Sequence, residues 1–191
     1  MLWLITGGIA SGKSRFAEHL AASLGREGIY LSCETFPGYA AKLPRTGQSP
    51  SFPWLHAEAD ATLAMKLRSI NEESNLYRAE RRVLVVDSLS GWLRRAMKTA
   101  DKPAEAVFEE VIGELIAYQG KLIVVSEETA VCAFPEEPAV SFAYRIADAN
   151  RTLSERSRAT YRLTAGIAAE MKGYRVTREV NGDENIYENG R

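Results

Sequence analysis

The amino-acid sequence predicts an α/β fold with a mostly parallel central sheet between two layers of helices. Short, continuous apolar runs recur along the chain, which is typical of strands that are buried on both faces of a parallel sheet. Longer amphipathic stretches separate these runs, as expected of the crossover helices that join parallel strands. At 191 residues the chain is long enough for one such domain and short for two.

The first strand is predicted at residues 2–6 and leads directly into Gly-Gly-Ile-Ala-Ser-Gly-Lys-Ser, which we call the phosphate loop (residues 7–14). A helix follows at 15–24. In this arrangement the backbone N–H groups at a helix N-terminus cradle phosphate oxygens. The pattern therefore predicts a P-loop NTPase-type three-layer fold that binds a nucleoside triphosphate, either ATP or GTP. A dinucleotide-binding turn is excluded because Gly-x-Gly-x-x-Gly is absent.

Each residue type in the phosphate loop has a physical reason to be there. Gly7, Gly8 and Gly12 let the backbone take positive φ and approach a ligand closely. Lys13 is predicted to reach the outer phosphates, and the Ser14 hydroxyl to bind Mg²⁺. The residues expected to bind the nucleotide are Gly7, Gly8, Ile9, Ala10, Ser11, Gly12, Lys13 and Ser14.

A second site residue follows from the apolar strand at 83–86, which ends on Asp87. A carboxylate at the C-terminal end of a buried parallel strand lies where α/β sheets bind their ligands. We therefore expect Asp87 to serve the Mg²⁺ ion of the phosphate loop and, with Lys13, to be catalytic. The alternative is that Asp87 only caps the helix that begins at Ser88.

The rest of the chain continues the alternation of strands and helices. Further strands are predicted at 28–32, 121–126 and 161–164, and helices at 58–70, 103–118 and 140–156. Four prolines make residues 33–57 a long predicted loop. The polar segment 71–82 is predicted to be a connector or a frayed helix end. We expect residues 1–172 to form one P-loop kinase-like domain. Residues 173–191 form a charged C-terminal extension in which 174–177 suits one short strand.

Composition excludes several classes of protein. Hydrophobic residues make up 46% and charged residues 26%, which is ordinary for a globular protein. A net charge of −1 indicates no nucleic-acid partner. No apolar run approaches the about 20 residues of a membrane span. Cys33 and Cys132 stand far apart and suggest no disulfide framework, so we expect a reduced, cytoplasmic protein.

Beyond the phosphate loop, several stretches occur in an order that points to one family. They are residues 6–18, Trp54 with Glu58, residues 87–93 (Asp-Ser-Leu-Ser-Gly-Trp-Leu), Val125-Ser126 with Glu128 and Pro135, Asn150 with Leu153, and Gly166-Ile167 with Lys172. Together they resemble the adenosylcobinamide kinase/adenosylcobinamide-phosphate guanylyltransferase family of cobalamin biosynthesis. The resemblance covers about residues 1–172.

The resemblance implies a parallel-sheet phosphate-loop fold that often assembles as a homotrimer. It also implies a kinase in which a hydroxyl of a corrinoid acceptor, adenosylcobinamide, attacks the γ-phosphoryl group of ATP or GTP. Two alternatives keep the fold and change the function. One is a kinase that acts on another small molecule, and the other is a nucleotide-binding regulatory protein that has lost group transfer.

One departure from the family bears on the guanylyltransferase step, which uses a histidine after the second strand that becomes covalently attached to GMP. Counting back from Trp54 places Arg45 at that position, and arginine has no free lone pair to attack phosphorus. Only two histidines are present. His19 lies within the first helix, where a surface or packing role is expected. His56 has the wrong offset for a simple replacement, so we expect no histidine-linked guanylate.

Other positions of the family's motifs are also altered. Glu127 stands where asparagine is expected, Ala130 where glycine is expected, and Arg95 where asparagine is expected. The helix motif at 142–150 lacks its arginine. Arg145 lies two residues away, which turns its side chain by about 200° around the helix. The nucleotide-binding half of the predicted site is therefore intact, while the half for the corrinoid or covalent GMP is altered.

Overall fold

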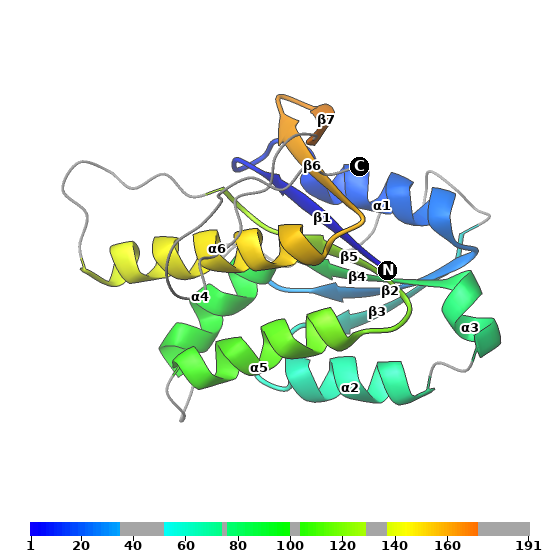
Figure 1. Cartoon of the computed structure of the whole chain (residues 1–191), viewed down its shortest axis with the longest axis horizontal. Coiled ribbons are helices and arrows are strands. Elements are labelled where there is room, and N and C mark those ends of the chain that lie inside the picture. The colour runs from blue at the N-terminus through cyan, green and yellow to red at the C-terminus, as the bar shows by residue number, and fades with distance from the viewer. Residues whose placement is uncertain (35–51, 74–75, 100–103, 129–136, 172–191) are drawn as a thin grey trace, which may run out of the picture.

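Figure 1 shows the computed structural model of the chain, which describes residues 1–34, 52–73, 76–99, 104–128 and 137–171. These residues form a seven-stranded sheet with the order β3-β2-β4-β5-β1-β6-β7. The strands are β1 (Leu2–Gly7), β2 (Glu27–Ser32), β3 (Trp54–Glu58), β4 (Arg82–Asp87), β5 (Lys121–Val125), β6 (Ala159–Thr164) and β7 (Ile167–Met171). The helices are α1 (Lys13–Leu24), α2 (Leu63–Glu73), α3 (Leu76–Arg81), α4 (Leu89–Thr99), α5 (Ala104–Ala117) and α6 (Glu137–Arg156).

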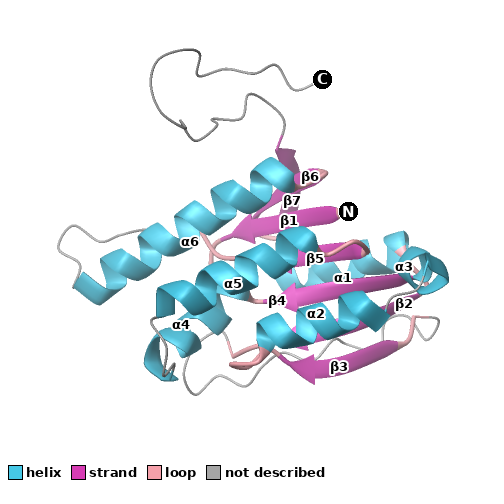
Figure 2. Ribbon diagram, turned by 60° about the horizontal axis from the view of Figure 1, so that its bottom comes forward, coloured by secondary structure: helices cyan, strands magenta, loops and turns pink. Residues whose placement is uncertain are grey.

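The sheet is parallel from β3 to β6, and β7 alone pairs antiparallel, with β6. Figure 2 shows α2, α5 and α6 in front of the sheet and α1 behind it. Alternate strand residues feed the two resulting cores: Leu2 and Leu4 face the layer of α2, α4, α5 and α6, whereas Trp3 and Ile5 face α1. The strands read as continuous apolar runs because both faces are covered. The predicted three-layer α/β fold with a mostly parallel central sheet is confirmed.

The long helix α6 is apolar on one side only. It has 20 residues, buries Ile146, Ala149 and Leu153, and leaves Tyr144 exposed. Such a stripe is typical of a helix that packs on a sheet or on neighbouring helices. In the part of the chain that the structure describes, no helix has the length and apolar character needed to cross a membrane.

The predicted loop at 33–57 is wrong at its end, because Trp54–Glu58 forms the edge strand β3, parallel to β2. Its side chains are half-buried or exposed, so it lacks the apolar run that marks the inner strands. The next helix begins at Leu63 rather than at 58, since Asp60 Oδ1 accepts a hydrogen bond of 2.9 Å from the Thr62 N–H and caps it. Residues 35–51 lie outside the described residues.

Two further elements differ from the sequence-based prediction. The segment 71–82, predicted as a connector or frayed helix end, contains the end of α2, the short helix α3 and the first residue of β4. β7 was not predicted, because all five of its residues are exposed and carry no periodic pattern. It follows a tight turn at Ala165 (φ 50°) and Gly166 (φ 83°). The strand suggested at 174–177 and the rest of the extension 173–191 lie outside the described residues.

The edge strand β3 packs a tryptophan side chain against a glycine of β2. A Cβ atom built on Gly28 would lie 2.2 Å from the Trp54 ring, a distance that no side chain tolerates. The Gly28 N–H also donates a 3.0 Å hydrogen bond to the Pro53 carbonyl. The indole therefore occupies the space of the missing side chain and sets how closely β3 approaches β2.

Candidate nucleotide-binding site

The phosphate loop connects β1 to α1 and bends at two glycines. Gly7 has φ 145°, and a Cβ there would lie 2.4 Å from the Leu163 carbonyl oxygen. Gly12 has φ 99°. The prediction of positive φ is wrong for Gly8, and Ala10 (φ 57°) takes a left-handed conformation instead. No atom lies within 4 Å of a Cβ built on Gly8, so this glycine leaves its side of the loop open.

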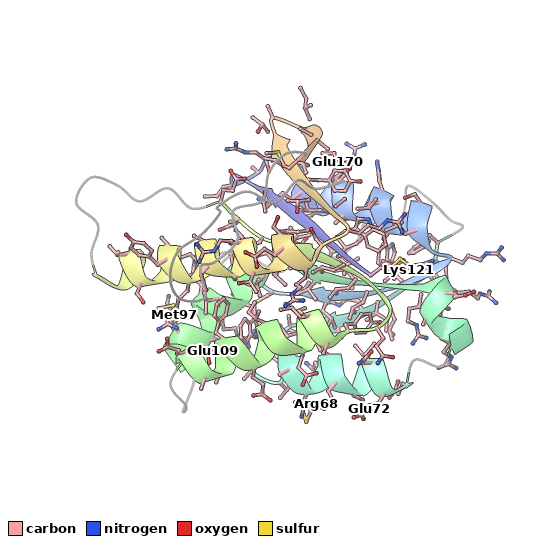
Figure 3. The ribbon with its side chains drawn as sticks, in the orientation of Figure 1. Arg68, Glu72, Met97, Glu109, Lys121 and Glu170 are labelled. Atoms are coloured by element: carbon pink, nitrogen blue, oxygen red, sulfur yellow. The ribbon has the colours of Figure 1, made fainter. Side chains whose placement is uncertain are left out.

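The ammonium group of Lys13 is held inside the loop. Its Nζ donates hydrogen bonds to the Gly7 carbonyl at 3.0 Å and to the Gly8 carbonyl at 2.6 Å. Lys13 is buried, so its positive charge lies among the loop carbonyls rather than in solvent. Lys121, labelled in Figure 3, makes the same kind of contact at the start of β5, with the Leu24 and Glu80 carbonyls.

The loop and the helix that follows carry donors that suit an anion. α1 begins with Gly12 as its N-cap, without a side-chain cap and without an acidic residue in its first turn. The N–H groups of that turn and the helix dipole therefore favour a negative ligand. Ser11 Oγ is buried, and none of the described residues provides a hydrogen-bond partner for it. An unsatisfied buried hydroxyl in this position fits a bound phosphate oxygen.

Ser14 and Asp87 both reach the hydroxyl of Tyr30. Tyr30 donates a hydrogen bond of 2.5 Å to Asp87 Oδ2, and its hydroxyl is also hydrogen-bonded to the Ser14 side chain. Burial and the negative charge of Asp87 raise the pKa of Tyr30 far above its usual range, so the phenol stays a neutral donor. The structure thus brings together the two residues for which a metal role is predicted. Sequence reasoning missed Tyr30, which reads as a core residue of β2.

The residues present fit a magnesium ion. Magnesium is usually held by one or two protein oxygens, with phosphate and water oxygens completing its shell. Ser14 and Asp87 supply a hydroxyl and a carboxylate of this kind. Within the described residues there is no group of three or more histidine, cysteine or acidic side chains that would suit an all-protein metal site.

The capping role considered for Asp87 is filled by its neighbour. Ser88 Oγ accepts a hydrogen bond of 3.0 Å from the Gly91 N–H, which is the geometry of an N-cap on α4. The Asp87 carboxylate instead accepts a hydrogen bond from the Tyr30 hydroxyl. The carboxylate therefore points toward the phosphate-loop side of the sheet.

A hollow of about 530 Å³ lies between the phosphate loop and β6, lined by Gly8, Ile9, Ala10, Ser11, Glu128 and residues 162–165. Glu128 is fixed there by three contacts. Its carboxylate accepts from Thr6 Oγ1 at 3.0 Å and pairs with Arg162 at 2.8 Å, and its N–H donates to the Gly7 carbonyl at 3.1 Å. The sequence pointed to Glu128 as a site residue only through the family motif. No feature of the sequence pointed to Arg162.

The altered family positions form structural contacts. Glu127, a buried residue, pairs with Arg94 at 2.8 Å, and its carbonyl accepts a 3.0 Å hydrogen bond from Asn150 Nδ2. Arg95 pairs with Glu58 at the surface. Arg145 pairs with Glu105 of α5 at 3.6 Å. Ala130 and Arg45 lie outside the described residues.

The two histidines lie in different surroundings. His19 is exposed on α1, as expected. His56 belongs to β3 rather than to a loop, and its Nε2 lies 2.6 Å from Ser32 Oγ. Its imidazole stacks against Tyr30, with the ring centroids 6.4 Å apart and an interplanar angle of 24°. The sequence placed His56 away from the site, whereas the strand register brings it beside Tyr30.

A family model and a curated relative point to the same family. The family model described as cobinamide kinase / cobinamide phosphate guanyltransferase matches residues 3–171. The bifunctional adenosylcobalamin biosynthesis protein CobP of Pseudomonas aeruginosa is 30% identical over 179 residues, which are 89% of this chain and 96% of that protein.

Two solved structures are also similar to the chain. A RadB recombinase has a TM-score of 0.48 and 15% identity, covering 92% of this chain and 87% of its own. A type III secretion ATPase of pathogenic bacteria has a TM-score of 0.45 and 12% identity, covering 88% and 56%.

Proposed function

Because the chain belongs to the cobinamide kinase / cobinamide phosphate guanyltransferase family, we propose that it is a nucleoside-triphosphate-dependent kinase of cobalamin biosynthesis that phosphorylates adenosylcobinamide. Its substrates are then ATP or GTP and a corrinoid acceptor. The observation that carries the proposal is the meeting of Ser14 and Asp87 at the Tyr30 hydroxyl, beside a phosphate loop that encloses Lys13.

The proposed chemistry is mainly positioning and charge neutralisation. The N–H groups of residues 7–14 bind the phosphate chain, and Lys13 turns from the loop carbonyls to the β- and γ-phosphates. Ser14 and Asp87 would hold Mg²⁺, which neutralises phosphate charge when bound. The acceptor hydroxyl attacks the γ-phosphorus, and the nucleoside diphosphate leaves with the electrons of the broken P–O bond.

We propose that the guanylyltransferase step is missing from this chain. The family resemblance expects a histidine where the count from Trp54 places Arg45. His19 is exposed on α1, and His56 lies on β3, after Trp54 rather than before it. The kinase step needs no covalent intermediate, because the acceptor attacks the nucleotide directly, so one activity can be absent without the other.

The decisive experiment incubates the purified protein with Mg²⁺, cobinamide and either ATP or GTP, followed by mass analysis of the corrinoid and of the protein. The proposal expects a phosphorylated corrinoid and an unmodified protein. Turnover that does not depend on cobinamide would favour a kinase of another small molecule. Nucleotide binding without any turnover would favour a regulatory protein, the alternative that the altered motif at 142–150 supports.

Further properties of the chain remain predictions from its sequence. They are a kinase domain at 1–172 with a charged extension at 173–191, a homotrimeric assembly, a cytoplasmic location and no nucleic-acid partner. Light scattering of the purified chain tests the assembly, and removal of residues 173–191 tests whether the domain retains nucleotide binding without them.

A further inference from the structure

Two polar side chains meet where β2 and β3 end, beside the candidate metal ligands. His56 Nε2 lies 2.6 Å from Ser32 Oγ. Ser32 is aligned with Asp87 in the register of β2 and β4, which are direct neighbours. Ser32 is 1% exposed, whereas His56 is exposed. The pair thus joins a buried hydroxyl next to Asp87 to an imidazole that a ligand can reach.

The strand order gives the two substrates different sides of the site. β5 and then β1, with its phosphate loop, lie on one side of β4, and β2 and then β3 lie on the other. Parallel sheets bind ligands at the carboxyl ends of their strands. A phosphoryl group held between the loop and Asp87 would lie next to the carboxyl end of β2, with β3 beyond it. α1 packs against β1, β2, β4 and β5, and His56 on β3 is left exposed.

The imidazole is the exposed end of a row of rings. Phe52 and Trp54 meet edge to face with centroids 4.8 Å apart, Trp54 and Tyr30 at 5.5 Å, and Tyr30 and His56 stack at 6.4 Å. The Tyr30 hydroxyl at the same time holds Asp87. Tyr30 therefore holds the carboxylate of the candidate metal site through its hydroxyl, while its ring lies beside the imidazole.

The Ser32 contact occupies Nε2 and leaves Nδ1 as the ring nitrogen that a ligand could meet. A serine hydroxyl can accept a hydrogen bond from an imidazole N–H. When Nε2 carries the proton and donates it to Ser32 Oγ, Nδ1 keeps its lone pair. None of the described residues is hydrogen-bonded to Nδ1, and the imidazole it belongs to is exposed. This nitrogen can accept a proton from a bound ligand.

We propose that His56, oriented by Ser32, is the catalytic residue on the acceptor side, where its Nδ1 contacts the attacking hydroxyl and takes its proton. This rests on the proposed kinase function. In the step, the acceptor oxygen forms a bond to the γ-phosphorus, and the bond from that phosphorus to the bridging oxygen breaks. The nucleoside diphosphate leaves with the electron pair, and the hydroxyl proton moves to Nδ1, giving an imidazolium whose Nε2–H remains on Ser32.

The first test observes the imidazole directly. Because the chain has two histidines, ¹⁵N-histidine labelling gives two sets of ring signals, which His19→Gln assigns. Cobinamide is titrated into the wild-type protein with Mg²⁺ and a non-hydrolysable ATP analogue. The proposal expects the Nδ1 signal of His56 to shift while both His19 signals stay fixed. An unchanged Nδ1 signal overturns it, and no variant at position 56 is needed.

The second test measures turnover. His56→Gln should lower kcat for cobinamide phosphorylation by about 100-fold without changing the Kd for nucleotide, and His19→Gln should leave both unchanged. Ser32→Ala should shift the Nε2 signal of His56 and lower kcat by a smaller factor than His56→Gln does. Ser32→Thr keeps a hydroxyl and should match the wild type in both measurements. Wild-type kcat in His56→Gln overturns the catalytic role and leaves the proposed kinase intact. If the wild-type protein does not phosphorylate cobinamide, the proposed function fails, and the titration alone decides whether His56 contacts a corrinoid.

Discussion

Tyr30 donates a hydrogen bond of 2.5 Å to Oδ2 of Asp87 from a side chain that has no exposed surface. A phenol in this position cannot rotate away without breaking the packing around its ring, so it holds the carboxylate in one orientation. The same hydroxyl is hydrogen-bonded to the Ser14 side chain. Tyr30 thus links the end of β4 to the start of α1. The candidate metal ligands are thus arranged by the protein before any ligand arrives.

Asp87→Asn should depress Mg²⁺-dependent turnover far more than thermal stability, because asparagine keeps the shape and removes the charge that a divalent ion needs. The measurements are turnover against Mg²⁺ concentration and thermal unfolding. Ser88→Ala is the control, since loss of the α4 cap should cost about 1 kcal/mol of stability with an unchanged Mg²⁺ dependence. Equal losses of turnover and stability in Asp87→Asn would contradict the metal role.

Lys13→Ala should weaken nucleotide binding by roughly 10- to 100-fold, because a charge-assisted contact to phosphate is lost. Calorimetric titration with ATP and GTP measures the change. Lys121→Ala is a matched control, since Lys121 also donates to two main-chain carbonyls but at the opposite end of the sheet. It should lower stability and leave nucleotide affinity unchanged. A folded Lys13→Ala variant with wild-type affinity would show that the site is elsewhere.

No histidine-linked guanylate should form. Labelled GTP and Mg²⁺ are incubated with the protein, which is then denatured in alkali to preserve any phosphoramidate. We expect no label on the protein, because Arg45 stands at the family's histidine position and cannot act as a nucleophile. A stoichiometric, acid-labile adduct would sink this prediction, and its mapping to His56 would show that the nucleophile had moved to β3.

Arg94→Met should destabilise the fold by about 3 kcal/mol, because it leaves the Glu127 carboxylate buried without its partner. Urea unfolding measures the loss. The neighbouring variant Arg95→Met is the control, since its partner Glu58 is exposed and surface pairs contribute at most about 1 kcal/mol. Restoration of stability in Arg94→Met/Glu127→Met would confirm that the cost arises from the unpaired charge. Equal effects of the two single variants would contradict the assignment.

Asp60 should make stability depend on acid pH. Burial opposes its ionisation, but hydrogen bonds from Lys66 and Thr62 outweigh it and lower the pKa of Asp60 from 3.8 to about 2. A lowered pKa stabilises the folded state above pH 3.8, and this stabilisation disappears as the pH falls toward 2. Asp60→Asn keeps the cap and removes the charge. The difference in urea stability between the two proteins should be constant near neutrality and close between about pH 4 and 2.

Much of the fold could be predicted because the inner strands are buried on both faces. β1, β4 and β5 are unbroken apolar runs in the sequence for that reason. The phosphate loop is recognised by its Gly-x-x-x-x-Gly-Lys-Ser pattern. The edge strands β3 and β7 could not be found in the same way, since their exposed side chains carry no burial pattern. Their pairing is set by the neighbouring strand and not by their own composition.

The site residues could be predicted where a motif or a position in the fold points to one specific role. Lys13 and Ser14 follow from their spacing, and Asp87 from its place at a strand end. Tyr30 and Ser32 could not be singled out. Within an apolar strand, a tyrosine is expected to be a core residue and a serine carries no functional signal. Their roles arise from the register that aligns Ser32 with Asp87 and Tyr30 with His56, and a register is a property of paired strands.

The indole of Trp54 fills the space above Gly28, and this ties the evolution of two strands together. A mutation that gives residue 28 a side chain must either push the edge of the sheet outward or be preceded by a smaller residue at 54. Because His56 lies two residues after Trp54, such a displacement would carry the histidine away from Ser32. Substitution at position 28 is therefore restricted by a residue in another strand. Homologues that carry a side chain at position 28 should also carry a smaller residue at position 54.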